Sequence, residues 1–363
     1  MKAMTKRERV LRTINFQETD RIAVYDLIDC NSIREYYGGG KIQADNAWDF
    51  EYAAVRNMLD MTRGLMIPNF NPGVTTIDDD GFEWYHDKDT SWIKTHPFED
   101  VAGMKKWVER HIEKQNKWVP DANYVETYRK TIQKHQKGIG DDTVIVVESD
   151  VGFDFARNRA GIELFSYFMV EYPELLSEWL EALNQAEIRR AKAIADPALV
   201  PVMLTYSDIA FKSGPIFSPE FYRKEFFPRL KKLNNTYQEA GVKCLFHSDG
   251  NLMPILDDLV AADIDGINPM EVLAGMEIGI VRQRYGSRLF ITGGIDVSQL
   301  MAFGTPGEVR EACRKAIDDA GGVGYFIGST TELHPAVKLE NALAMVETAH
   351  TYTIAPLPGM IQK

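Results

Sequence analysis

Short apolar runs alternate with long amphipathic segments along this chain. Each run ends at a polar or small residue, and the segment after it carries apolar positions at helical spacing. This alternation is typical of an α/β protein with a parallel sheet, because a helix connects each strand to the next one. The runs expected to form strands are residues 21–27, 65–68, 144–147, 200–206, 242–246, 266–267, 289–295 and 324–328.

Eight strands separated by helices are what a (β/α)8 barrel of the TIM type requires. Residues 1–363 are therefore expected to form a single barrel domain of the α/β class. A doubly wound open sheet is the alternative, but no glycine-rich fingerprint follows the first strand. Residues 75–95 interrupt the alternation, and two short runs that flank Asp87-Lys-Asp89 predict an inserted hairpin there.

The composition is that of an acidic globular protein. A formal net charge of −12 and a pI near 5.2 disfavour nucleic acid and membranes as partners, since both attract basic surfaces. No apolar run approaches the roughly 20 residues that span a bilayer, and residues 1–9 hold no apolar signal segment. Cys30, Cys244 and Cys313 are too scattered for a disulfide framework, so a cytoplasmic location is expected.

A polar or acidic side chain lies at the end of every expected strand. In a barrel these positions line one mouth, which is where such enzymes keep their active sites. Turns also favour Asp and Asn for local reasons, so the set carries more weight than any one member. With two tyrosines from the same ends, the residues expected to bind substrate are Tyr25, Asp26, Glu148, Asp150, Tyr206, Asn268, Asp296 and Ser329.

His247 is the strongest single candidate for chemistry. It follows the run 242–246, and Asp249 lies two residues further on, so both side chains point to the same side. With Asp208 they are the expected catalytic residues, as metal ligands or as general acid and base. Two ligands are too few for zinc; Asp208, Glu148 and Glu225 are candidates for the third, and the expected metal set is His247, Asp249 and Glu225. The alternative is a half-buried histidine that bonds a backbone carbonyl.

Several motifs together resemble the uroporphyrinogen decarboxylase superfamily, which includes tetrapyrrole decarboxylases and cobalamin-dependent methyltransferases. The resemblance covers nearly the whole chain, is strongest after Ser207, and implies a distorted (β/α)8 barrel. The segments that carry it are residues 5–11 (TKRERVL), 19–21 (TDR), 218–221 (SPEF), 227–228 (FP), 247–251 (HSDGN), 293–296 (GGID) and 340–341 (EN).

Departures from the family patterns favour one branch. The decarboxylases carry an arginine-rich motif that holds the substrate's carboxylates, but here Asp26-Leu-Ile-Asp29 stands in its place. The methanol and methylamine methyltransferases bind zinc through His-x-Cys and a distant cysteine. Asp249 replaces the first cysteine here, and Ser329, Thr330 or Thr331 takes the place of the second.

The resemblance therefore implies a methyltransferase with a harder metal site. Zinc held by a histidine and carboxylates would act as a Lewis acid on an ether oxygen. The aryl-ether demethylases of the superfamily are the nearest analogue, and they pass the methyl group to the Co(I) corrinoid (cobalamin) of a partner protein. The expected partners are a small methoxylated methyl donor, with an aromatic one favoured, and that corrinoid protein; a homodimer is an open alternative to a monomer.

Two other functions are kept as alternatives. One is a decarboxylase or lyase of a small carboxylic acid, with Asp208 or Asp249 as proton donor and Arg157 or Arg159 holding the carboxylate. The other is a non-catalytic binding or chaperone role in corrinoid handling. Metal analysis and release of CO₂ by metal-free protein distinguish the first alternative from the methyltransferase.

Overall fold

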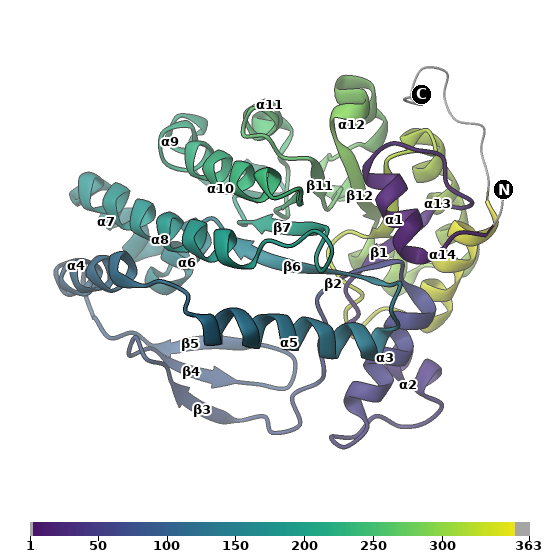
Figure 1. Cartoon of the computed structure of the whole chain (residues 1–363), viewed down its shortest axis with the longest axis horizontal. Helices are drawn as coiled ribbons and strands as arrows, with labels where there is room; N and C mark the ends of the chain where they lie inside the picture. The colour runs from purple at the N-terminus through teal and green to yellow at the C-terminus, as the bar shows by residue number, and fades with distance from the viewer. Residues whose placement is uncertain (1–2, 353–363) are drawn as a thin grey trace.

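A closed parallel barrel forms the centre of the computed structural model, which describes residues 3–352 (Figure 1). The strands follow the order β1-β13-β12-β11-β10-β7-β6-β2 around the barrel, which confirms the expected TIM-type fold. Residues 1–2 and 353–363 of the expected domain lie outside the described residues. The barrel strands are β1 (Ala23–Asp26), β2 (Met61–Arg63), β6 (Val144–Asp150), β7 (Val202–Tyr206), β10 (Lys243–His247), β11 (Gly266–Asn268), β12 (Phe290–Ile295) and β13 (Tyr325–Ser329).

Helices surround the barrel and fill the connections between its strands. Local signals place their ends: Ser218 accepts a hydrogen bond from Phe221 N, and Thr305 and Glu308 form a capping box. Across residues 3–352, none of the helices has the length and apolar character needed to cross a membrane. The helices are α1 (Lys6–Ile14), α2 (Asn31–Gly38), α3 (Ala47–Met58), α4 (Val101–Lys117), α5 (Ala122–Ile139), α6 (Phe153–Ala160), α7 (Ile162–Glu171), α8 (Pro173–Ile194), α9 (Pro219–Glu225), α10 (Phe227–Glu239), α11 (Leu256–Ala261), α12 (Ile278–Tyr285), α13 (Pro306–Ala320) and α14 (Leu339–Thr351).

Alternate residues of each strand point into the barrel and fill it. Val146, Leu204 and Leu245 belong to one buried apolar cluster of inward-facing side chains. Two residues further along their strands, the same inward positions are Glu148, Tyr206 and His247. The interior therefore changes from apolar to polar at the carboxyl ends of the strands, and this polar end is the mouth of the barrel.

The second strand lies earlier in the chain than the apolar pattern predicts. The run at residues 65–68 is not a strand; β2 is Met61–Arg63, which pairs with β1 and β6. The pattern failed because Met61 is the only apolar residue of β2, so this strand presents no apolar run. Asn69, the residue after that run, donates through Nδ2 to the carbonyl of Asp87 at 2.8 Å.

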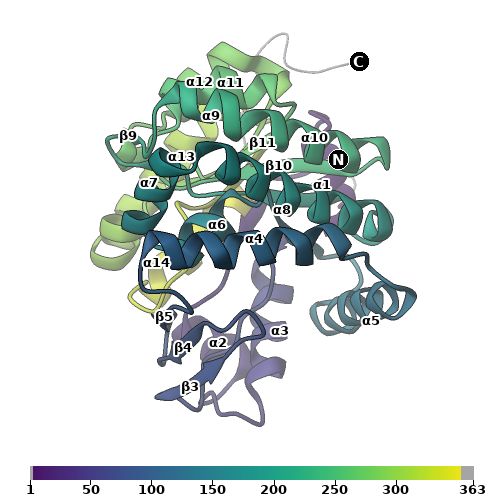
Figure 2. The ribbon, with the colours of Figure 1, turned by 90° about the vertical axis from the view of Figure 1, so that its left-hand side faces the viewer.

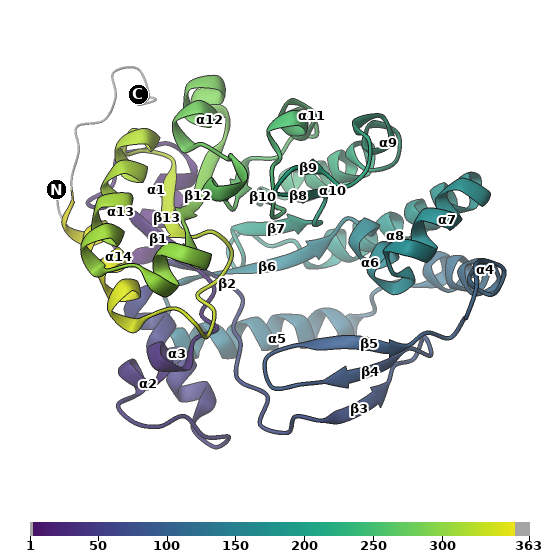
Figure 3. The ribbon, with the colours of Figure 1, turned by 180° about the vertical axis from the view of Figure 1, so that it is seen from behind.

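The insertion is a three-stranded antiparallel sheet rather than a two-stranded hairpin. The expected hairpin is β4 (Glu83–His86) and β5 (Ser91–Thr95), and β3 (Val74–Ile77) adds a third strand. Figures 2 and 3 show this sheet as a separate layer outside the barrel. Arg159 of α6 fastens it, because its guanidinium pairs with Asp78 and lies 5.0 Å from the ring centre of Trp84.

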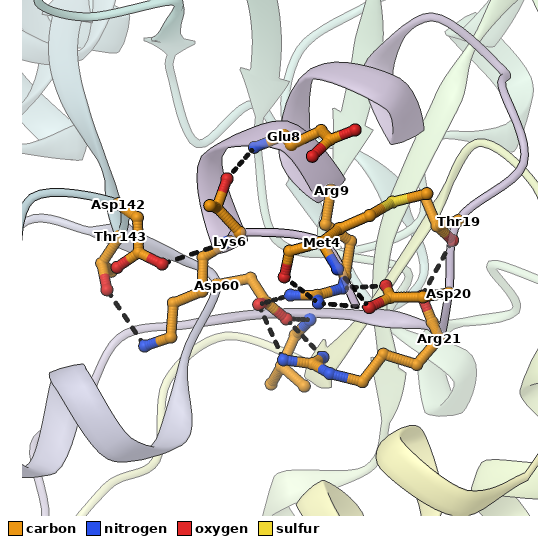
Figure 4. Close-up of polar contacts among 12 residues, drawn as sticks. Met4, Lys6, Glu8, Arg9, Thr19, Asp20, Arg21, Asp60, Asp142 and Thr143 are labelled. Atoms are coloured by element: carbon orange, nitrogen blue, oxygen red, sulfur yellow. Dashed lines mark hydrogen bonds and ion pairs between the residues drawn. The ribbon is translucent and has the colours of Figure 1, made fainter. Parts of the chain in front are cut away.

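A charge cluster closes the opposite, amino-terminal end of the barrel (Figure 4). Asp60, which is fully buried, accepts hydrogen bonds from Arg9 Nη1 at 2.7 Å and from Arg21 Nη1 at 2.7 Å. Its Oδ2 also accepts from Val24 N at 2.9 Å, and Asp20 pairs with Arg9 Nε at 2.7 Å. The cluster thus ties α1 to the first two strands.

Replacing Asp20 by Asn should weaken the acid sensitivity of the fold. Although burial acts the other way, hydrogen bonds from Arg9 and Met4 N lower the pKa of Asp20 from 3.8 to about 2. Its contribution to stability is therefore present above pH about 4 and lost as the pH falls through about 2. Because the side chain is partly solvated, the expected effect is small. Between pH about 4 and pH about 2, the free energy of unfolding of wild type should fall by roughly 1 kcal/mol more than that of Asp20→Asn. Urea unfolding at both pH values measures this, and parallel losses in the two proteins would contradict it.

Candidate metal and substrate site

Asp208, His247 and Asp249 meet at the barrel mouth and are called the His–Asp cluster here. Their ligand atoms lie within 4.8 Å of one another, with Asp208 in the loop after β7 and the other two at the end of β10. Nε2 of His247 lies 3.9 Å from Oδ1 of Asp208, and the backbone N of Asp249 donates to that same oxygen at 3.1 Å. One nitrogen and two carboxylates are thus presented to a common point.

A chain of hydrogen bonds orients the His247 ring. Nδ1 of His247 lies 2.6 Å from Oδ1 of Asn268, whose Nδ2 donates to Thr292 Oγ1 at 2.6 Å. The Thr292 hydroxyl in turn donates to the Ile267 carbonyl at 3.2 Å. Since that carbonyl only accepts, the direction of the chain makes Nδ1 the protonated nitrogen and leaves the Nε2 lone pair free.

Burial keeps the His247 ring neutral. The side chain is only 3% exposed, and burial lowers the pKa of His247, with the positive charge of Arg63 acting in the same direction. Asp208 and the bond to Asn268 act against this shift and are weaker. At neutral pH the imidazole is therefore a lone-pair donor.

Asp249 lies in an excess of negative charge. Burial raises its pKa to about 7, and the nearby charges of Asp208, Glu271 and Glu332 add to the effect. Oδ2 is 3.5 Å from the Thr331 hydroxyl, whereas Oδ1 is buried and has no hydrogen-bond partner. A cation or a proton would stabilise such an oxygen, because it is buried without a partner and surrounded by carboxylates.

Three charged residues of the mouth were not predicted from the sequence. Arg63 ends β2 and pairs with Glu148 at 2.9 Å, and it was missed because that strand was placed too late. Glu271 accepts a hydrogen bond from Gly250 N at 2.7 Å, and Glu332 accepts from Thr331 Oγ1 at 2.8 Å. Both glutamates lie three residues after a strand, so an inspection of the loops as well as the strand ends would have found them.

Asp26, Ser329 and Tyr25 lie together at the ends of β1 and β13. Asp26 accepts from Ser329 N at 2.8 Å and from Ser329 Oγ at 2.8 Å. Burial nevertheless raises the pKa of Asp26 to about 7. The hydroxyl of Tyr25 is buried without a partner. This pair of strands therefore adds a second carboxyl that gains a proton near neutral pH.

Two predicted substrate ligands have local structural roles. Asp150 accepts from Gly152 N at 2.8 Å and from Phe155 N at 3.0 Å, so it begins α6. Asp296 accepts from Gln299 N at 2.8 Å and from Leu300 N at 2.7 Å, so it caps the turn Val297–Met301. Turn and cap formation, the local explanation for acids after strands, accounts for both.

Glu225, the expected third metal ligand, does not join the His–Asp cluster. Its buried carboxylate on α9 pairs with Arg229 Nη1 at 2.9 Å, one helical turn later. The helix α9, which Ser218 caps, carries Glu225 away from the strand end, and its carboxylate meets an arginine four residues later. Within residues 3–352, the third side chain grouped with His247 and Asp249 is that of Asp208 instead.

Both arginines after β6 are already paired with acids. Arg157 donates to Asp154 and to the backbone carbonyl of Asp208, and Arg159 binds Asp78 of the inserted sheet. Arg157 thereby helps to hold the loop that carries Asp208. Neither guanidinium is free to hold a substrate carboxylate, which weighs against the decarboxylase alternative.

The fold and this mouth agree with a known family. The chain belongs to the uroporphyrinogen decarboxylase (URO-D) family, whose model matches residues 84–352. It is 20% identical to methylcobamide:CoM methyltransferase MtbA of Methanosarcina mazei over 366 residues, covering 97% of this chain and 99% of that protein. MtbA of Methanosarcina acetivorans is 25% identical over 182 residues, 49% of this chain and 50% of that protein.

A solved structure confirms the architecture. A methyltransferase from Methanosarcina mazei superposes with a TM-score of 0.71 at 17% sequence identity, covering 95% of this chain and 98% of the other. At this level of identity the similarity establishes the barrel fold. The family model confirms the motif-based resemblance to the superfamily.

Proposed function

We propose that this protein transfers a methyl group from a small methoxylated compound to the Co(I) corrinoid of a partner protein, using zinc held by the His–Asp cluster. Membership of the URO-D family and two relatives named as methylcobamide methyltransferases support methyl transfer. The observation that carries the proposal is the convergence of three ligand atoms within 4.8 Å at the mouth. All three cysteines are buried and free, which fits the cytoplasmic location expected from the sequence.

The residues present fit a zinc ion. His247 offers a bare Nε2, Asp249 offers a buried oxygen that lacks a partner, and Asp208 completes the three protein ligands usual in catalytic sites. A divalent cation would also offset the repulsion between Asp249 and the nearby acids. No sulfur belongs to the cluster, so the site is harder than a thiolate site.

Bound zinc would supply a Lewis acid that polarises an ether oxygen and makes it a better leaving group. The chain's own residues prepare the site for this. Asn268 fixes the His247 tautomer, the Asp249 amide holds the Asp208 carboxylate, and Arg157 holds the Asp208 backbone. Arg63 is neutralised by Glu148, so the mouth keeps its negative charge.

Asp249 has an alternative role if no metal is bound. Burial and nearby acids raise the pKa of Asp249 to about 7, so this carboxyl is able to hold a proton near neutral pH. That proton could pass to the departing oxygen of the methyl donor. Metal analysis of the purified protein separates the two roles: we expect one zinc per chain, and a metal-free protein with full activity would leave Asp249 as the acid.

Asn268→Ala should weaken zinc binding without removing a ligand. The variant loses the bond that fixes the His247 ring, and loss of such an outer partner typically costs about 10- to 100-fold in metal affinity or activity. Zinc affinity measured by competition with a chelator tests this. Thr348→Ala, which removes a buried hydroxyl on α14 that bonds the Ala344 carbonyl, is the control. Equal zinc affinity in wild type and Asn268→Ala would rule out the positioning role.

A further inference from the structure

A second cavity lies between α4, α6 and α8, outside the barrel mouth. Figures 1 and 2 show these three helices together on one side of the barrel. The cavity has a volume of about 350 Å³, and sites for small molecules typically measure about 300–1,000 Å³. Its lining does not include the residues of the His–Asp cluster. We infer that this cavity binds a small organic ammonium ion, and the inference does not depend on the proposed function.

Three aromatic side chains line the cavity. Trp118, which directly follows α4, lies edge-on to Tyr124 of α5 with 5.6 Å between the ring centres, and Phe155 of α6 is the third. Backbone bonds hold Trp118 in place: its N–H donates to the Lys114 carbonyl at 3.2 Å, and its carbonyl accepts from Arg189 Nε at 2.8 Å. Aromatic rings attract ammonium groups, and more strongly where water is partly excluded.

Asp150 brings a carboxyl without a cationic partner to this cavity. Its oxygens accept backbone hydrogen bonds from Gly152 N at 2.8 Å and from Phe155 N at 3.0 Å, and within residues 3–352 no Lys or Arg pairs with it. Burial raises the pKa of Asp150 to about 7, and the charges of Asp154 and Glu187 add to the effect. A cation in the cavity would stabilise the ionised carboxylate.

Glu187 offers an oxygen for an ammonium N–H. Its Oε1 accepts hydrogen bonds from the Ser149 hydroxyl and from Arg190 Nη1. Among the described residues no group donates to Oε2, although the side chain is only 17% exposed and lines the cavity. An ammonium ion would therefore bind Oε2 without breaking the existing bonds of Glu187.

The lining lysine and arginine are already paired. Lys114 Nζ donates to Asp80, and Arg190 bonds Glu187 and donates through Nε to the Tyr124 hydroxyl at 3.0 Å. Of the charged residues that line the cavity, Asp150 is therefore the one without a counter-charge. This imbalance attracts a positive ligand.

Calorimetry with three compounds of similar size tests the class of ligand. The full chain is titrated at pH 7.5 with benzylammonium, benzyl alcohol and benzoate, which are positive, neutral and negative. We expect one benzylammonium per chain, bound at least about tenfold more tightly than either of the other two. Asp208→Asn, which removes a charge of the mouth, is expected to keep the wild-type affinity for benzylammonium, because the cavity is a separate site.

Two variants of the lining locate the binding. Glu187→Gln removes a negative charge but keeps an acceptor for Ser149, and Trp118→Ala removes an aromatic ring. Each is expected to weaken benzylammonium binding about tenfold. Glu178→Gln and Trp92→Ala are the matched controls, since they make the same changes at an exposed residue of α8 and at a tryptophan of the inserted sheet, neither of which lines the cavity.

Any of four results would overturn the assignment. These are no binding of benzylammonium to wild type, equal affinity of wild type for benzyl alcohol or benzoate, unchanged benzylammonium affinity in both Glu187→Gln and Trp118→Ala, and loss of binding in Asp208→Asn. The last result would place the ion at the mouth. Circular dichroism verifies that each variant is folded, and the two lining variants lie on different elements, so a folding defect in one leaves the other as a test.

Discussion

His247→Ala is expected to abolish stoichiometric zinc and to lower the rate of methyl transfer by about 100- to 1,000-fold or more. The variant removes the one nitrogen ligand of the His–Asp cluster and leaves two carboxylates that are already in an excess of negative charge. Lewis-acid stabilisation of the leaving oxygen contributes several kcal/mol, and about 1.4 kcal/mol corresponds to a factor of ten.

Metal content by mass spectrometry and single-turnover kinetics measure both effects. His135→Ala is the control, because it removes a half-buried histidine outside the His–Asp cluster, one that bonds Tyr52 at 3.1 Å between α5 and α3. His247→Gln, which keeps a polar side chain of similar length, guards against an effect of cavity formation alone. A His247→Ala protein that retains one zinc and the wild-type rate would exclude the histidine from the chemistry.

Asp60→Ala is expected to destabilise the fold by about 3–5 kcal/mol. The fully buried carboxylate binds Arg9 and Arg21, and its removal leaves both guanidinium groups without their shared partner. The variant also loses the carboxylate oxygen that accepts a hydrogen bond from the Val24 amide of β1. Such a loss is a large part of the stability of an ordinary domain.

Thermal and urea unfolding of the purified variant measure this loss. Asp45→Ala is the control, since Asp45 is exposed, and a surface change of this kind is expected within about 0.5 kcal/mol of wild type. If Asp60→Ala unfolds at the same urea concentration as Asp45→Ala, the charge cluster does not hold the amino-terminal end of the barrel together.

The fold could be predicted because most barrel strands have a recognisable apolar pattern in the sequence. Strands β7, β10 and β12 are rich in apolar residues and are bounded by turns, so their positions and order follow from the sequence. Strand β2 could not be placed, because only Met61 of its three residues is apolar. The third strand of the inserted sheet was missed for a related reason: β3 is exposed along its whole length and carries little hydrophobic signal.

The site was predictable where neighbouring strand ends supply it. His247 and Asp249 follow one strand and Asp208 follows the adjacent one, so their proximity follows from parallel pairing of β7 with β10. Glu225 and Arg63 show the limit of this reasoning. The partner of Glu225 is set by a helical turn on the outside of the barrel, and Arg63 depends on the boundary of a strand that the pattern misplaced.

The most direct test follows the cobalt itself. The zinc-loaded protein is mixed with 2-methoxyphenol and a Co(I) corrinoid protein, and the absorbance of Co(I) is recorded with time. The account predicts that the Co(I) band decays as methyl-Co(III) forms, and that His247→Ala leaves the band unchanged over the same period. A Co(I) band that stays constant with wild type and every methoxylated donor, while metal-free protein releases CO₂ from a small carboxylic acid, would contradict the account and favour a decarboxylase.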